Sequence, residues 1–216
     1  MSARYPGYDV LSKRDTPSWN EQTRRVVDER LAIDPDRPQF LDDEQWRLLR
    51  AVCARIVPQP PERRDPVPLA AMVDAKLAKD ERDGGRDARL PPPREAWTRG
   101  LAAIDAEARA RHDHAFDALD AARQDALLTY IQRGETRTEA WGDMPPGLFF
   151  THRLLHDIVA SYYGHPHAWN EIGFGGPASP RGYVRMNFDR RDPWEAAEAK
   201  PGHEEEAYEA NRRVGR

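Results

Sequence analysis

Apolar residues recur at helical spacing over much of this chain and predict a mostly helical protein. After Asp42, which has capping-box spacing to Gln45, apolar side chains return every three or four residues until Pro58 stops the helix. One similar stretch precedes this one and others follow it, and all these stretches together predict about six helices. Their apolar positions are Trp19, Val26, Val27 and Leu31; Trp46, Leu49, Cys53 and Ile56; Leu69, Met72, Val73 and Leu77; Trp97, Leu101, Ile104 and Ala108; Ala121, Leu127, Leu128 and Ile131; and Phe150, Leu154, Leu155, Ile158 and Val159.

Polar and helix-breaking residues set the expected ends of these helices. Ser18 has capping-box spacing to Glu21 and predicts the start of the first helix, which the prolines within residues 34–38 end. Gly134 closes the fifth helix in a C-terminal capping position. Gly164 ends the sixth, where a stretch without helical or strand period begins.

The same signals give an expected domain organisation. Residues 1–17 read as an extended N-terminal arm, residues 18–199 as a single helical domain, and residues 200–216 as a flexible C-terminal tail. Residues 58–68 form a stiff, proline-rich connector. The predicted fold class is therefore all-α: an irregular helical domain with proline-rich arms and a C-terminal loop of glycine, proline and aromatic residues.

That C-terminal stretch, residues 162–183, is the most distinctive part of the sequence. Its glycines and prolines predict irregular backbone, and its glycines permit close approach to a neighbouring surface. Its aromatic residues either cap the helical core or anchor a partner, because Tyr and Trp serve both roles. The candidate partner-binding residues are Tyr162, Tyr163, His165, His167, Trp169, Asn170, Phe174, Gly175, Gly176 and Tyr183, with Trp169, Phe174 and Tyr183 as the expected anchors.

Composition and charge narrow the function classes. The 216 residues are 39% hydrophobic and 32% charged, with a formal net charge of -4, so a concentrated basic face for nucleic acid is not expected. The arginines alternate with acids and read as surface ion-pairing groups. No stretch approaches the roughly 18 apolar residues of a membrane span, so direct membrane insertion is not expected.

The single cysteine, Cys53, lies on an apolar helical stripe and is expected to be a buried, unreactive side chain. One cysteine excludes an internal disulfide and a cysteine-based metal site within the chain. The first residues contain neither a twin-arginine signal nor an apolar signal region. The expected location is therefore cytoplasmic.

The histidines raise a different possibility. His152 and His156 stand four residues apart on a predicted helix, and His165 and His167 follow within about three turns' reach. This spacing can hold a metal ion if a third histidine, or the carboxylate of Asp157 or Glu171, converges with them. A free-standing metalloenzyme acting on a sugar or related metabolite is therefore the alternative function. No motif for a hydrolytic nucleophile or a nucleotide-binding loop accompanies it.

The segment 162–177, read as YYGHPHAWNEIGFGGP, resembles the C-terminal signature of the gluconate 2-dehydrogenase subunit 3 family. Earlier pieces follow that family's order between Leu41 and Tyr183. They are REAWTRGLAAID at 94–105, FDAL at 116–119, QDALL at 124–128 and FF at 149–150.

The resemblance implies a small subunit that is not catalytic alone and belongs to an FAD-dependent oxidoreductase complex. Its partner would be a large subunit of the glucose-methanol-choline (GMC) type that holds FAD and oxidises a sugar or sugar acid, so no cofactor is expected in this chain. Family members resemble dedicated chaperones that help the large subunit mature or remain stable. No catalytic or metal-ligating residue is carried over onto this sequence.

Two departures from the family pattern matter. Exported relatives carry a twin-arginine signal that this sequence lacks, which favours a cytoplasmic complex. Residues 165–168 read HPHA where many relatives have tyrosine, paired glycines and asparagine. A further hypothesis places His165 or His167 in the partner's active site.

Overall fold

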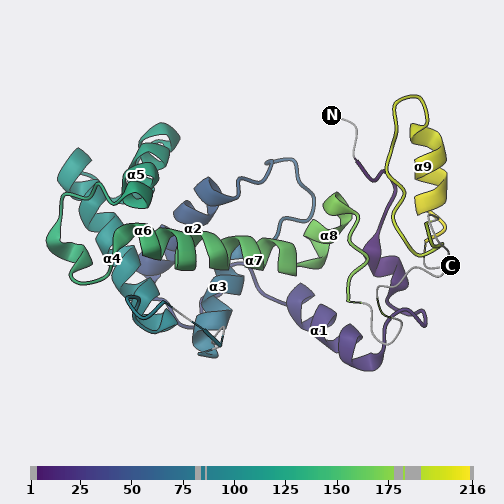
Figure 1. Ribbon diagram of the computed structural model, residues 1–216, viewed down its shortest axis with the longest axis horizontal. Coiled ribbons are helices and arrows are strands. Elements are labelled where there is room, and N and C mark those ends of the chain that lie inside the picture. The colour runs from purple at the N-terminus through teal and green to yellow at the C-terminus, as the bar shows by residue number, and fades with distance from the viewer. Residues whose placement is uncertain (1–3, 81–83, 86, 178–181, 183–190, 215–216) are drawn as a thin grey trace. The chain divides into compact units, whose positions relative to one another are not determined.

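The structure is a computed structural model that describes residues 4–80, 84–85, 87–177, 182 and 191–214 (Figure 1). These residues contain helices and no β-strand, which confirms the all-α prediction. They divide into two compact units, Asp34–Tyr162 and a second unit made of Met1–Ile33 and Tyr163–Arg216. This division differs from the single domain expected over 18–199, because residues from both ends of the chain pack together.

The unit Asp34–Tyr162 contains most of the predicted helices. In chain order its elements are α2 (Asp43–Ile56), α3 (Leu69–Ala78), α4 (Pro93–His112), the 3₁₀ turn η2 (Phe116–Ala118), α5 (Ala121–Arg133), the 3₁₀ turn η3 (Glu139–Trp141), α6 (Pro146–Phe149), the π-helical turn η4 (Phe150–Leu155) and α7 (His156–Gly164), whose last two residues belong to the other unit.

Capping residues place several of these ends where the sequence predicts them. The Asp42 side chain accepts a hydrogen bond from Gln45 N at 2.8 Å, and the Gln45 side chain accepts one from Asp42 N, so the capping box of α2 is confirmed. Asp120 caps α5, and Gly134 ends it in the left-handed conformation. Cys53 is buried on α2, as expected.

An aromatic cluster fills the core of this unit. The ring centroid of Phe149 lies 5.8 Å from that of Trp97 and 5.7 Å from that of Trp141. Gly100 on α4 lies directly beneath Phe149, since a Cβ built there would come within 2.1 Å of the ring. The close packing of α4 on α6 therefore depends on glycine at this position.

The predicted sixth helix is a continuous run of α6, η4 and α7. The π-helical turn inserts extra backbone, which rotates the following side chains around the helix axis. Leu154 and Ile158 are buried as predicted, but Leu155 is 36% exposed and Arg153 is buried. The broad apolar face expected from sequence is therefore narrower, and an arginine takes part of its place.

Buried ion pairs correct the expectation that the arginines are all surface groups. Arg111 pairs with the fully buried Glu107 at 3.2 Å, and Arg153 lies 3.7 Å from Asp157. Most other pairs are exposed, as predicted; the contact of Arg55 with Asp125 is an example. Helix packing, which sequence spacing does not reveal, decides which arginines become buried.

The second unit contains the 3₁₀ helix η1 (Val10–Lys13), α1 (Glu21–Leu31), α8 (Pro166–Ile172) and α9 (Glu204–Asn211). Asn20, and not Ser18, is the N-cap of α1, because its side chain accepts a hydrogen bond from Thr23 N at 2.9 Å. Figure 1 shows the purple N-terminal segment between α8 and α9 within this unit.

Both chain ends are folded where the sequence suggested an arm and a tail. Val10 and Lys13 are fully buried in η1, and Ala207, Asn211 and Val214 are buried in or just after α9. Over the described residues 4–17 and 200–214, the structure therefore differs from the extended arm expected over 1–17 and the flexible tail expected over 200–216. Contacts between residues about 200 positions apart order these segments, and local sequence patterns cannot report such contacts.

Candidate functional site

The candidate site lies around α8, within the stretch 162–183 that was expected to be a loop. Pro166 occupies the first helical turn, the His165 side chain accepts a hydrogen bond from His167 N at 3.3 Å, and Gly173 ends the helix at φ 67°. The helix is only two turns long and lies between prolines and glycines. It therefore contains too few apolar positions for a helical period to be recognised in the sequence. The irregular part begins after Ile172.

Trp169 is the centre of this region. Its side chain is 2% exposed, its Nε1 donates a 2.7 Å hydrogen bond to Tyr163 O, and its ring meets that of Phe174 edge-on at 5.5 Å. It belongs to a buried cluster drawn from both chain ends: Tyr8, Val10, Trp19, Val27, Trp169 and Val214. In the isolated chain the Trp169 indole is therefore part of the core.

Asn170 links α8 to the N-terminal segment. Its Oδ1 accepts a 2.8 Å hydrogen bond from Val10 N, and its Nδ2 lies 3.4 Å from the Asp9 carboxylate. The backbone amide at the start of η1 is thereby satisfied by a side chain 160 residues away in sequence. Asn170 has a structural partner within its own unit.

The glycines after α8 admit the N-terminal segment at close range. A Cβ at Gly173 would lie 2.6 Å from the Tyr5 ring, one at Gly175 2.9 Å from Lys13 Nζ, and one at Gly176 2.8 Å from the Trp19 ring. The sequence predicted a close neighbour for these glycines. The structure identifies that neighbour as residues 5–19 of the same chain.

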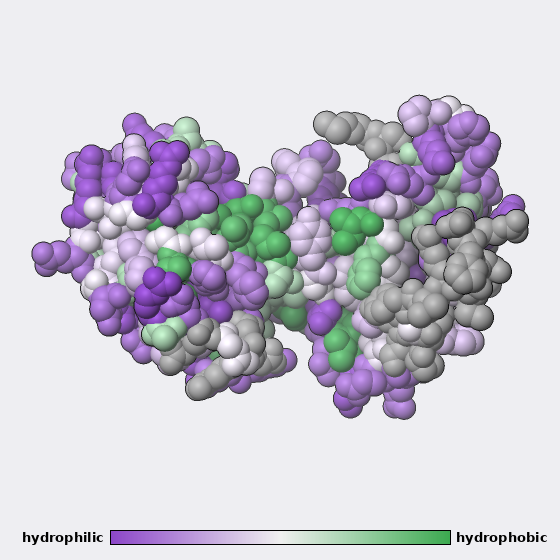
Figure 2. Space-filling view, in the orientation of Figure 1, coloured by the Kyte–Doolittle hydropathy of each residue, from purple (hydrophilic) through white to green (hydrophobic). Residues whose placement is uncertain are grey.

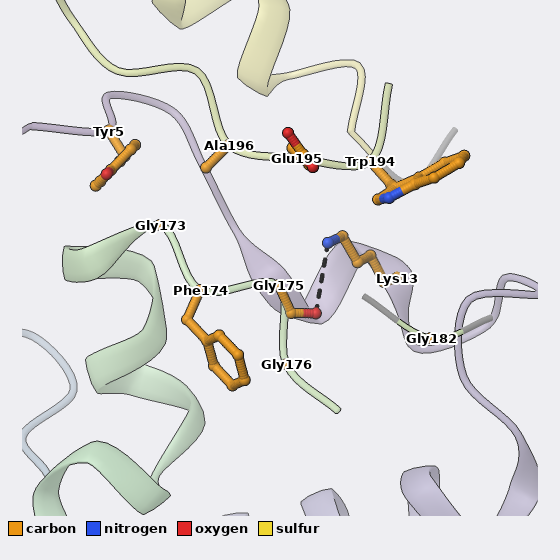
Figure 3. Close-up of a pocket in the computed structure, with 10 residues that line it drawn as sticks. All are labelled: Tyr5, Lys13, Gly173, Phe174, Gly175, Gly176, Gly182, Trp194, Glu195 and Ala196. Carbon is orange, nitrogen blue, oxygen red and sulfur yellow. Dashed lines mark hydrogen bonds between the residues drawn. The ribbon is translucent and has the colours of Figure 1, made fainter. Parts of the chain in front are cut away.

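A pocket of about 290 Å³ lies beside this contact (Figure 3). The amine of Lys13, which is fully buried, donates a 3.4 Å hydrogen bond to Gly175 O and lies 5.7 Å from the centre of the Tyr8 ring. In Figure 3 the Glu195 side chain lies across the amine from Gly175. The volume is near the lower limit of small-molecule sites, about 300 Å³.

The four histidines of the metal hypothesis are divided between different surroundings. His152 and His156 are exposed, and His156 Nδ1 lies 3.1 Å from the Asp157 carboxylate. His165 is buried as the cap of α8, with its ring 4.6 Å from that of His167. Within the residues that the structure describes, no three His, Cys, Asp or Glu side chains gather in a way that could hold a metal ion.

Two side chains on the outside of this region are well exposed. Tyr163 is 51% exposed at the end of α7, and Ile172 is 43% exposed at the end of α8. Figure 2 shows a mostly hydrophilic face with smaller hydrophobic patches. Tyr163 and Ile172 are the two most exposed large hydrophobic side chains among the described residues. Ile172 was not among the predicted site residues. A helix predicted over 166–172 would have made Ile172 a candidate site residue.

The remaining candidates occupy other positions. Tyr162 is buried in the unit Asp34–Tyr162, where its hydroxyl accepts a 2.8 Å hydrogen bond from Arg63. Phe174 is partly buried, and Gly176 is buried. Tyr183, an expected anchor, lies outside the described residues. Most of the described candidates therefore lie around α8, and Tyr162 belongs to the other unit.

Over the described part of the chain, no helix combines the length and apolar character needed to cross a membrane. Comparison with curated proteins and with solved structures gives no match.

Comparison with protein families gives one informative result. The family described as Gluconate 2-dehydrogenase subunit 3 matches residues 43–176, from the first turn of α2 through Gly176. This range covers more than half of the 216 residues and includes the whole α8 region. The chain therefore belongs to the Gluconate 2-dehydrogenase subunit 3 family, the small subunits of a dehydrogenase complex.

Proposed function

We propose that this chain binds and stabilises the large subunit of an FAD-dependent, GMC-type sugar or sugar-acid dehydrogenase and helps it to mature, without being catalytic itself. The observation that carries the proposal is the family match over residues 43–176, since the family is defined as one subunit of a dehydrogenase. The flavin and the hydride chemistry would then belong to the partner.

The exposed residues at the ends of α7 and α8 support a contact surface there. Tyr163 and Ile172 are large, exposed and included in the matched range. Tyrosine is enriched at protein interfaces because it buries a large apolar ring while keeping a polar hydroxyl. We assign the direct contact to these two side chains, and the buried Trp169 indole holds the Tyr163 backbone through its hydrogen bond to Tyr163 O.

Co-expression with a GMC-type flavoprotein large subunit tests the proposal. The yield, FAD content and dehydrogenase activity of the large subunit are measured with and without this chain. We expect the large subunit to be poorly soluble or low in FAD when expressed alone. Recovery of a fully active, FAD-loaded large subunit without this chain would refute the proposed role.

Point variants test the contact surface. The double change Tyr163→Ala with Ile172→Ala is expected to weaken binding to the large subunit at least about tenfold, the effect of losing one interface hot spot. Tyr130→Ala is the matched control, because Tyr130 is a 38% exposed tyrosine on α5 in the other unit. Equal affinities for both variants would assign the contact elsewhere.

A further inference from the structure

The last two residues of α7, Tyr163 and Gly164, are bonded by side chains from two other helices of their unit. Arg30, in the last turn of α1, donates a 2.6 Å hydrogen bond from Nη1 to Gly164 O. Trp169, on α8, donates a 2.7 Å hydrogen bond from Nε1 to Tyr163 O. The last carbonyls of a helix have no partner within that helix. Side chains therefore satisfy two consecutive carbonyls at this end of α7.

Packing within the unit places Arg30 near that helix end. Val27 lies three residues before Arg30 on α1 and is fully buried in the cluster that also contains Trp169. Residues three positions apart lie on the same face of a helix, so Arg30 extends from the face of α1 that packs into this cluster. Burial of Val27 thereby helps to determine where the Arg30 guanidinium reaches.

The charge of Arg30 is compensated by a helix end. In the part of the chain that the structure describes, no acidic side chain pairs with Arg30, and its guanidinium bonds to Gly164 O. Arg30 is partly buried, and burial lowers the pKa of its guanidinium from the ordinary value. A cation is favourable at a helix C-terminus, because the aligned peptide dipoles leave partial negative charge there.

This end of α7 carries Tyr163, one of the two side chains assigned to direct contact with the large subunit. Tyr163 is 51% exposed, and its backbone lies between the bonds from Trp169 and Arg30. A contact residue that is already ordered loses less conformational entropy when the partner binds. A fixed backbone at Tyr163 should therefore increase the affinity for the partner.

Arg30 lies outside the part of the chain that defines the family. The matched residues 43–176 include Tyr163, Gly164 and Trp169, but α1 precedes them. The contact side chain and one of its supports thus come from the family-defining part. The second support comes from a helix that the family match does not include.

We propose that Arg30 is a positioning residue for the contact with the large subunit. By holding the end of α7, it presents Tyr163 in its binding position, and it acts through Tyr163 without touching the partner. This role rests on the proposed function, since it assumes that a large subunit binds at Tyr163. The hold on the end of α7 is a property of the isolated chain.

Hydrogen exchange of the isolated chain, measured by mass spectrometry, tests this hold. In Arg30→Ala we expect exchange of peptides covering 160–168 to rise by up to about tenfold, the effect of losing one hydrogen bond. Arg25→Ala is the control, because Arg25 is an exposed arginine of the same helix that bonds to Gln22. Unchanged exchange in Arg30→Ala, or an equal rise in Arg25→Ala, would overturn the proposal.

The matched variants Arg30→Lys and Arg30→Met separate the hydrogen bond from side-chain packing, and they apply even if Arg30→Ala fails to fold. Both new side chains are long and unbranched, but only lysine keeps a positively charged donor. We expect Arg30→Lys to stay close to the unchanged chain in exchange and in affinity for the large subunit, and Arg30→Met to show the larger changes. Equal values for the two variants would rule out the bond to Gly164 O as the cause.

A double-mutant cycle with an FAD-loaded GMC-type large subunit tests the positioning role. Arg30→Ala alone should weaken binding by about two- to tenfold, the effect of having to order one more group on association. In a chain that already carries Tyr163→Ala, the same change should weaken binding no further. Equal weakening in both backgrounds would overturn the proposal, because Arg30 would then contribute independently of Tyr163.

Arg94→Ala controls for the loss of a helix-end bond elsewhere. Arg94 donates to Leu77 O and Ala78 O at the end of α3, in the other unit, and its loss should leave affinity unchanged. An equal loss of affinity would contradict a specific role for Arg30. If the unchanged chain and Arg30→Ala bind equally tightly, the positioning role fails and the proposed function stands. If the unchanged chain does not bind, the proposed function fails and the positioning role fails with it.

Discussion

The carboxylate of Asp157 accepts a 2.8 Å hydrogen bond from the indole Nε1 of Trp97, deep inside the unit Asp34–Tyr162. The other oxygen of Asp157 lies 3.4 Å from Lys76 Nζ, and Arg153 approaches to 3.7 Å. One buried acid thus connects α3, α4 and α7. Its negative charge also compensates the positive charges of Lys76 and Arg153, which helix packing has shielded from water.

Removing this acid should destabilise the protein strongly. Asp157→Ala leaves Arg153 and Lys76 without the buried carboxylate, and we expect the free energy of unfolding in urea to fall by about 3–5 kcal/mol. Asp125→Ala is the control, because Asp125 pairs with Arg55 at the surface and should cost about 1 kcal/mol or less. Similar losses for the two variants would argue against a buried charge network.

Gly100→Ala should also destabilise the protein, although alanine is usually preferred over glycine inside a helix. Alanine is favoured over glycine inside a helix by about 1 kcal/mol, but its Cβ here would lie 2.1 Å from Phe149 Cζ. Overpacking of this kind costs about 1–3 kcal/mol, so the melting temperature should fall. At Gly164 a Cβ would meet nothing within 4 Å, and Gly164→Ala should leave the melting temperature nearly unchanged.

The Glu107 carboxylate should make stability depend on pH in the acid range. Burial alone raises the pKa of Glu107, but hydrogen bonds from Thr138, Arg137 and Arg111 outweigh it and hold the pKa below the ordinary value of 4.5. A pKa lowered by folding stabilises the protein above the unfolded-state value, and this stabilisation is lost as pH falls through the folded-state pKa.

Urea unfolding at a series of pH values, from neutral to about pH 3, checks this behaviour. The unchanged chain should be more stable than Glu107→Gln at neutral pH, and the difference should shrink as the pH falls below about 4.5. Glu62→Gln, at an exposed position, is the control. A difference that stays constant over this range would contradict the assigned role of Glu107.

Cys53 should be unreactive in the folded protein. Burial raises the pKa of its thiol well above the ordinary value, so very little reactive thiolate exists at neutral pH. A thiol reagent such as DTNB should label it slowly under native conditions and rapidly in denaturant. Rapid labelling of the native chain would show that α2 opens readily or that Cys53 is accessible.

Local sequence patterns were sufficient to predict many of the helices in the unit Asp34–Tyr162. Asp42 and Gln45 mark the start of α2, and Gly134 marks the end of α5, because capping depends on residues only a few positions apart. The same reasoning failed at Leu155, where the π-helical turn changes the register of the apolar face. Packing, and not spacing, selected Arg153 for burial.

The α8 region shows most clearly what local sequence patterns cannot predict. Its glycines correctly indicated a close neighbour, but nothing in their spacing indicated that Tyr5, Lys13 and Trp19 would provide it. The bond between Val10 and Asn170 joins positions 160 residues apart. Ile172 became a candidate only when the helix 166–172 was known.

The sequence by itself determined the all-α class, the main helices of the unit Asp34–Tyr162, the burial of Cys53 and the family, since these depend on short-range periodicity and motifs. Only the tertiary structure decided that the two chain ends fold over α8, that Trp169 is buried, and that Tyr163 and Ile172 are exposed beside it. The reason is physical: a residue's burial depends on which distant segments pack against it, whereas local propensity depends only on residues nearby in the sequence.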